Sequence, residues 1–224
     1  MAISSGVRTF IDSFDRAQAL TTTPGMNGWT VKDTSSTGTP TYLCASGGGM
    51  VLTLAATSEA EVVTMYTNDV LAIPLAKLDK MWFVAKVSGI DSVTTLVMGA
   101  ASAQNDTADS VSVNAWFRME GSASTSLVVA ETDDGTTDND DKATSVSLSS
   151  TYKKFLIDFS QGLSDVRFYA DGARVAQATT FSMSAASGSQ NLQPFVQIQK
   201  ASGTGVPAVT IAEYGVQYRY AYGA

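Results

Sequence analysis

The amino-acid sequence of 224 residues contains no histidine. This absence excludes Ser-His-Asp and Cys-His activation of a nucleophile, zinc bound by histidine, and the iron site built from two histidines and a carboxylate. It also removes the side chain that most often transfers protons near neutral pH. Chemistry that needs only carboxylates remains available.

Cysteine is nearly absent, because Cys44 is the one cysteine of the chain. A single thiol excludes an internal disulfide framework and a cysteine-rich metal site. Cys44 lies in an apolar stretch, Tyr42–Ala45, so we expect a small buried hydrophobic side chain rather than a reactive thiol. We predict no cofactor.

Charged residues are scarce as well, at 16% of the chain, against about 25% in typical soluble domains. The 14 basic and 21 acidic residues give a formal net charge of −7. Binding to a phosphate backbone depends on a basic surface. We therefore expect no nucleic-acid partner.

Long apolar runs are missing too. The longest candidates, Val70–Leu75 and Met81–Val87, fall well short of the roughly 20 residues that cross a bilayer as a helix. The first residues have no basic region followed by an apolar one, so we expect no secretory signal and no membrane association.

What the sequence does contain is a two-residue alternation of apolar and polar side chains. In residues 111–119 the apolar side chains of Val111, Val113, Ala115, Phe117 and Met119 share one parity. This pattern is typical of a half-buried strand. About a dozen such segments are separated by Gly, Ser, Thr, Asn and Asp clusters, as in a β-sandwich or barrel. We predict an all-β jelly roll of antiparallel strands, a single domain over residues 1–224 with residues 1–8 as an N-terminal arm.

Two neighbouring segments, 152–159 and 166–175, are the most informative. Asp171-Gly172 predicts a two-residue hairpin, because a type I′ turn needs positive φ at both central positions. The motif Val-x-Phe-Tyr-x-Asp-Gly here resembles the concanavalin A-like (laminin-G-like) sandwich, as do the segments 10–14, 28–31 and 195–199. The resemblance implies a concanavalin-like jelly-roll fold, and a fold alone does not define a function.

Glycosidases of the concanavalin-like class carry paired carboxylates along one strand, as in Glu-x-Asp-x-x-Glu, since one carboxyl donates a proton while the other attacks or stabilises the sugar. We find no match in the chain. The nearest approach, Glu59 and Glu61, is interpreted as a solvated strand edge. We therefore expect that the chain is not an enzyme and has no catalytic residues.

The stretch 131–142 holds the densest charge of the chain. Ca²⁺ prefers six to eight oxygen ligands, so this acidic loop is one candidate for a cation site, although it does not fit the EF-hand pattern. The alternatives are a solvated hairpin tip and a surface that meets a basic partner. No metal ligand is assigned.

The last strand carries a row of tyrosines of one parity. Tyr214, Tyr218, Tyr220 and Tyr222 form a candidate partner interface, because tyrosine is enriched where proteins meet. The alternative is that this row packs on the core.

The composition together with the sandwich resembles that of bacteriophage virion proteins. This resemblance implies a decoration or cementing protein on the capsid exterior, made in the host cytoplasm, with the major capsid protein or other virion proteins as partners. A homo-oligomer, such as a trimer, is expected because closed symmetry is the rule. The alternative is a carbohydrate-binding, lectin-like module, free or displayed on a virion, with a surface glycan as its ligand.

Overall fold

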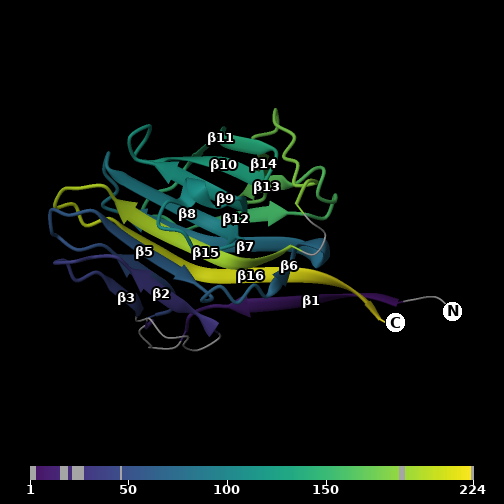
Figure 1. The fold of residues 1–224 in the computed structure, drawn as a ribbon, viewed down its shortest axis with the longest axis horizontal. Coiled ribbons are helices and arrows are strands. Elements are labelled where there is room, and N and C mark those ends of the chain that lie inside the picture. Colours follow the sequence, from purple (N-terminus) through teal and green to yellow (C-terminus); the bar gives the residue numbers. More distant parts are fainter. Residues whose placement is uncertain (1–3, 16–19, 22–27, 46, 187–189, 223–224) are drawn as a thin grey trace.

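In the computed structural model, two antiparallel sheets pack face to face (Figure 1). The structure describes residues 4–15, 20–21, 28–45, 47–186 and 190–222. Sheet A comprises, in spatial order, β14 (Ala173–Val175), β13 (Arg167–Ala170), β12 (Lys153–Asp158), β7 (Leu78–Ser88), β16 (Ala208–Tyr222), β4 (Met50–Thr53) and β3 (Thr41–Cys44), with β1 (Ser4–Asp12) also pairing with β16. Sheet B comprises β11 (Asp138–Ser147), β10 (Leu127–Asp134), β9 (Val113–Glu120), β8 (Thr94–Ala101), β15 (Asn191–Lys200), β5 (Glu61–Tyr66) and β2 (Thr30–Asp33), with β6 (Ile73–Pro74) pairing with β15.

Helical structure is limited to short 3₁₀ turns in the described residues, among them η2 (Leu75–Lys77) and η3 (Ala108–Ser110). In this part of the chain no helix is long and apolar enough to cross a membrane. The predicted all-β jelly-roll sandwich is confirmed, with more strands than the dozen that we expected.

The hairpin between β13 and β14 forms where the sequence predicts it. Asp171 and Gly172 both have positive φ, 48° and 82°, and Ala170 pairs with Ala173 across the turn. The Asp171 carboxylate accepts a hydrogen bond from the Lys154 backbone N–H at 2.9 Å, which ties the turn to β12.

The core lies between the two sheets. Phe117 of sheet B packs against Phe155 and Phe168 of sheet A, with ring centroids 4.9 and 5.1 Å apart. The two-residue period of β9 directs Val113, Ala115, Phe117 and Met119 into this core. The side chains between them are therefore directed to the outer face of sheet B.

A segment that we call the strap, residues 102–112, connects β8 to β9 and includes η3. Its Ala108 and Val111 are buried in a second apolar cluster with Trp116 and Phe195. The Asn105 carbonyl accepts a hydrogen bond from Gln197 Nε2 at 2.7 Å. The strap therefore lies across the outer face of sheet B and covers its aromatic side chains.

Two expectations about single positions need correction. Cys44 is half-buried at the edge strand β3, rather than fully buried. Glu61 is not a solvated edge residue, because its side chain is fully buried and lies 3.3 Å from Lys200 Nζ. Strand β5 lies inside sheet B, between β2 and β15, so its side chains have neighbours on both sides.

Of residues 1–8, for which we predicted an arm, residues 4–8 belong to β1, which pairs with β16 from Ser4–Tyr222 to Asp12–Tyr214. Figure 1 shows this two-stranded ribbon extending beyond the rest of the sandwich. Residues 1–3 lie outside the described part.

Candidate functional site

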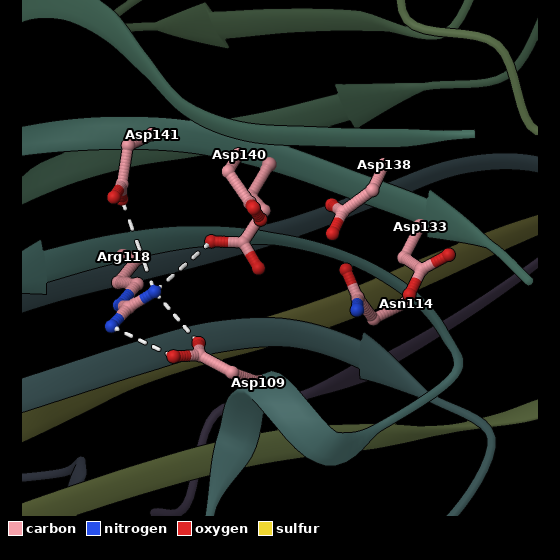
Figure 2. A pocket seen from close by; sticks show the side chains of 8 residues that line it. Asp109, Asn114, Arg118, Asp133, Asp138, Asp140 and Asp141 are labelled. Atoms are coloured by element: carbon pink, nitrogen blue, oxygen red, sulfur yellow. Dashed lines mark hydrogen bonds and ion pairs between the residues drawn. The ribbon is translucent and has the colours of Figure 1, made fainter. Parts of the chain in front are cut away.

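A pocket of about 190 Å³ opens on the outer face of sheet B, between three strands and the strap. We call it the acidic pocket. It is lined by Asp109, Asn114, Arg118, Glu131, Asp133, Asp138, Asp140 and Asp141 (Figure 2).

The strand period and register bring most of these side chains together. Asn114 and Arg118 have the parity of β9 that points away from the core. On β10, Asp133 pairs with Asn114, and Glu131 pairs with Trp116. Strand alternation therefore places both acidic side chains on the same outer face.

A β-bulge adds two further carboxylates. Ala130 pairs with Lys142 and Thr132 pairs with Asn139, so Asp140 and Asp141 together face Glu131. A bulge redirects side chains that regular alternation would place on opposite faces. Asp141 has a positive φ of 49°, and both aspartates line the pocket.

Arg118 is the cation of the acidic pocket. Its guanidinium lies 2.7 Å from Asp109 and 2.9 Å from Glu120, with longer contacts of 3.6 Å to Glu131 and 3.9 Å to Asp141. Asp109 belongs to the strap, so the ion pair also fixes the strap to β9.

Two carboxyl groups here have strongly raised pKa values. Burial raises the pKa of Glu131 to about 7 despite the opposing charge of Arg118, and this side chain is 2% exposed. Asp138 is an exposed residue of β11, and partial desolvation, the hydrogen bond to Asp140 and the nearby negative charges raise its pKa to about 6. Such shifts cluster at functional sites.

Three buried side-chain atoms at the acidic pocket have no hydrogen-bond partner among the described residues: Asn114 Oδ1, Arg118 Nε and Glu131 Oε2. The Asn114 Nδ2 group donates to the Val111 carbonyl at 3.0 Å, which leaves the amide oxygen as its free end. An unsatisfied buried polar group costs about 1–3 kcal/mol. Three such atoms at one pocket therefore lower the stability of the free protein.

The acidic stretch 131–142 is the hairpin of β10 and β11. Its turn and the carboxylates of Asp138, Asp140 and Asp141 are exposed, whereas Glu131 is buried. Glu131 and Asp133 lie on β10, and Asp138, Asp140 and Asp141 lie on β11. Across the described residues, no group of three or more acidic, histidine or cysteine side chains is arranged to hold a metal ion.

Sequence reasoning missed part of this site. Asn114, Arg118 and Asp109 were not selected, although the alternation in β9 already marked the first two as facing away from the core. Glu131 and Asp133 also fill the first two positions of the Glu-x-Asp-x-x-Glu pattern, and Thr136 stands at the third. That partial match is the signal that could have drawn attention to β10.

The tyrosines of β16 differ in their surroundings. Tyr214 is 2% exposed and packs against Trp29 and Phe83, with ring centroids 5.2 and 5.3 Å away. Tyr218 is half-buried against the core. The side chains of Tyr220 and Tyr222 lie outside the described residues. The interface at these four positions stays a prediction.

No protein-family model and no curated protein matches the sequence. Solved structures do match. The catalytic domain of an endo-1,3-β-glucanase (laminarinase) from Thermotoga petrophila RKU-1 has a TM-score of 0.62 at 11% identity, covering 99% of this chain and 100% of that chain. The carbohydrate recognition domain of Emp46p has a TM-score of 0.58 at 9% identity, covering 93% and 94%. The Crh5 transglycosylase has a TM-score of 0.55 at 15% identity, covering 93% and 83%.

These similarities confirm the concanavalin-like jelly-roll sandwich. They also overturn our expectation that the chain is not an enzyme, because the fold is shared with an endo-glucanase and a transglycosylase. The expectation considered carboxylates along a single strand, whereas the acidic pocket collects carboxylates from two strands and the strap. The roles of capsid decoration, virion location and homo-oligomer stay predictions.

Proposed function

We propose that this protein binds a carbohydrate in the acidic pocket. The observation that carries the proposal is the set of buried atoms without a hydrogen-bond partner, Asn114 Oδ1, Arg118 Nε and Glu131 Oε2, although Glu131 Oε2 also lies 3.6 Å from the Arg118 guanidinium. Arg118 Nε is a hydrogen-bond donor, and Asn114 Oδ1 is an acceptor. The Glu131 carboxyl accepts hydrogen bonds when it is ionised and can donate one when it holds its proton. Sugar hydroxyls both donate and accept, so neighbouring hydroxyl groups can satisfy such a mixed set.

The size of the pocket limits what enters. Its 190 Å³ is below the roughly 300–1,000 Å³ of pockets that enclose drug-sized ligands. The strap covers Trp116 and Phe195, which stack with ring centroids 6.0 Å apart and are fully buried. No open aromatic platform is therefore available at these two residues, and polar contacts to one sugar unit or chain end must hold the ligand.

The similar structures support this class of ligand. One is named a carbohydrate recognition domain and others are named glucanases, although at 8–17% identity they establish only the shared fold. The pocket chemistry of this chain carries the proposal.

A glycan array with the purified full chain, followed by titration calorimetry of each hit, tests it. We expect Asn114→Leu to weaken binding at least tenfold, because it removes the free acceptor and fills the space with carbon. A matched control is Glu213→Gln, since Glu213 lies on sheet A and accepts a hydrogen bond from Trp82 Nε1 at 2.5 Å, which glutamine can still accept. Binding that Asn114→Leu leaves intact would refute the location of the site.

A second candidate is cleavage of the bound glycan, which the raised pKa of Glu131 favours. A carboxyl with a pKa of about 7 still carries a proton near neutral pH and can serve as a general acid. Asp140 and Asp141 of the bulge are the nearest candidates for the second carboxylate that glycoside hydrolysis requires.

The release of reducing ends from array hits separates the two candidates. We expect Glu131→Gln to abolish cleavage while Glu213→Gln retains it. If the wild-type protein binds a glycan without releasing reducing ends over days, cleavage is refuted and binding stands.

A further inference from the structure

The acidic pocket holds far more negative than positive charge. Six carboxylates line it, and Arg118 is its one lining cation. The contacts of Arg118 with pocket residues are to Asp109, Glu131 and Asp141. Figure 2 shows Asn114, Asp133 and Asp138 together at the opposite end of the pocket. We call these three residues the anionic end.

Among the residues that the structure describes, no basic side chain compensates the anionic end as Arg118 does at its own end. Asp133 and Asp138 have no ion-pair partner within 4.0 Å among the described residues, and Asp133 Oδ1 accepts a hydrogen bond from the Gly135 backbone N–H at 2.8 Å. The charged groups that act most strongly on Asp138 are the carboxylates of Asp140, Asp133 and Asp109. Asp138 therefore binds its proton more tightly than an ordinary aspartate, and a cation placed beside it competes with that proton.

Asn114 is the independent sign of a ligand here. It is 2% exposed, its Oδ1 atom has no partner, and its amide is oriented by the strap carbonyl of Val111. The fixed amide oxygen of Asn114 and the two neighbouring carboxylates together offer only hydrogen-bond acceptors. A group with several donors and a positive charge fits it, and a primary ammonium has three donors and no acceptor.

We infer that the ligand is an amino sugar with a free, protonated amine, and that its ammonium group binds at the anionic end between Asn114, Asp133 and Asp138. This inference rests on the proposed carbohydrate-binding function and names the class of sugar. The hydroxyl groups of the same unit then face Arg118 and Glu131. When the ammonium enters, the proton that Asp138 carries at mildly acidic pH leaves to solvent.

Titration calorimetry of the full chain with three sets of oligosaccharides of equal length tests the inference: glucosamine oligomers, their N-acetylated forms and glucose oligomers. We expect the free-amine oligomer to bind at least tenfold more tightly than the N-acetylated one at pH 6.5. Between pH 5 and pH 6, titrations in two buffers of different ionisation enthalpy should reveal proton release of up to about one proton per ligand.

A variant separates charge from shape. Asp138→Asn keeps the size of the side chain and removes its charge, so we expect it to abolish both the preference for the amine and the proton release. Weak binding of hydroxyl groups near Arg118 should persist in this variant. Glu213→Gln, on the other sheet, should retain the full preference, and thermal melts of both variants should match the wild type.

Each alternative outcome has a distinct meaning. Equal binding of glucose and glucosamine oligomers overturns the amine inference and leaves the proposed function standing. If the glycan array identifies a different ligand and none of the three sets of oligosaccharides binds, the amine inference is overturned as well. Two outcomes overturn the sugar class and count against the proposed function. One is that putrescine binds as tightly as the glucosamine oligomer. The other is that Ca²⁺ binds at the anionic end and that Asp138→Asn abolishes this Ca²⁺ binding.

Discussion

Replacing Glu131 with glutamine should stabilise the protein at alkaline pH and leave it nearly unchanged at acidic pH. The side chain is 2% exposed, and burial raises its pKa from the ordinary 4.5 to about 7. The folded state therefore binds this proton more tightly than the unfolded state does. The resulting contribution to the free energy of unfolding is fully present below about pH 4.5. That contribution is lost as the pH rises through about 7.

The size of the effect follows from the shift. One pKa unit corresponds to about 1.4 kcal/mol, so ionised Glu131 lowers the free energy of unfolding by about 3 kcal/mol at pH 8. Glutamine has the shape of the protonated acid and does not titrate. We expect Glu131→Gln to exceed the wild type by about 3 kcal/mol at pH 8 and to differ from it by less than about 1 kcal/mol at pH 4.5.

Urea unfolding followed by tryptophan fluorescence at the two pH values measures both differences. Asp138 titrates in both proteins, so its contribution cancels in the comparison. Glu213→Gln, a substitution of the same kind on the other sheet, is measured alongside as the control. If Glu131→Gln is instead less stable than the wild type at pH 8, the 3.6 Å contact with Arg118 outweighs desolvation, and the reasoning about the pocket is refuted.

Three further substitutions test the packing, each by urea unfolding at pH 7. Lys200→Met should lower the free energy of unfolding by about 3–5 kcal/mol, because it leaves the buried Glu61 carboxylate without its ion-pair partner. Adding Glu61→Gln should restore part of this stability. If the effects of the two substitutions are instead fully additive, the pairing is contradicted. Tyr214→Ala should cost about 3–5 kcal/mol because the ring is buried in the core, whereas a change below about 1 kcal/mol would indicate a surface role. Gly99→Ala should cost more than about 1 kcal/mol, since its Cβ would lie 2.2 Å from the Ala115 carbonyl oxygen, and an unchanged stability would mean that β8 and β9 can separate freely.

The polar groups of the acidic pocket lower the stability of the free protein. Its unpaired polar atoms and its excess of carboxylates are unfavourable in the free protein, and a ligand that satisfies them stabilises the folded state by mass action. The same groups therefore explain both the stabilisation expected from Glu131→Gln and the loss of ligand chemistry that we expect from this substitution.

Much of the fold was predictable from the sequence because its determinants are local. The alternation of side chains in β9 depends only on neighbouring residues, and it placed Phe117 in the core and Arg118 outside it. The Asp171-Gly172 turn depends on two backbone conformations that these residues adopt readily. The lack of histidine likewise decided at once which catalytic chemistries the chain cannot perform.

The site depended on features that no local pattern encodes. The bulge that turns both Asp140 and Asp141 toward Glu131 exists only in the pairing of β10 with β11. The ion pair of Asp109 with Arg118 requires the strap to fold back over sheet B, and Glu61 is buried because β15 brings Lys200 beside it. Residue types and their period determined the strands and the core, whereas the register between distant strands decided which charges meet, because the energy of a buried charge depends on partners that only the folded chain supplies.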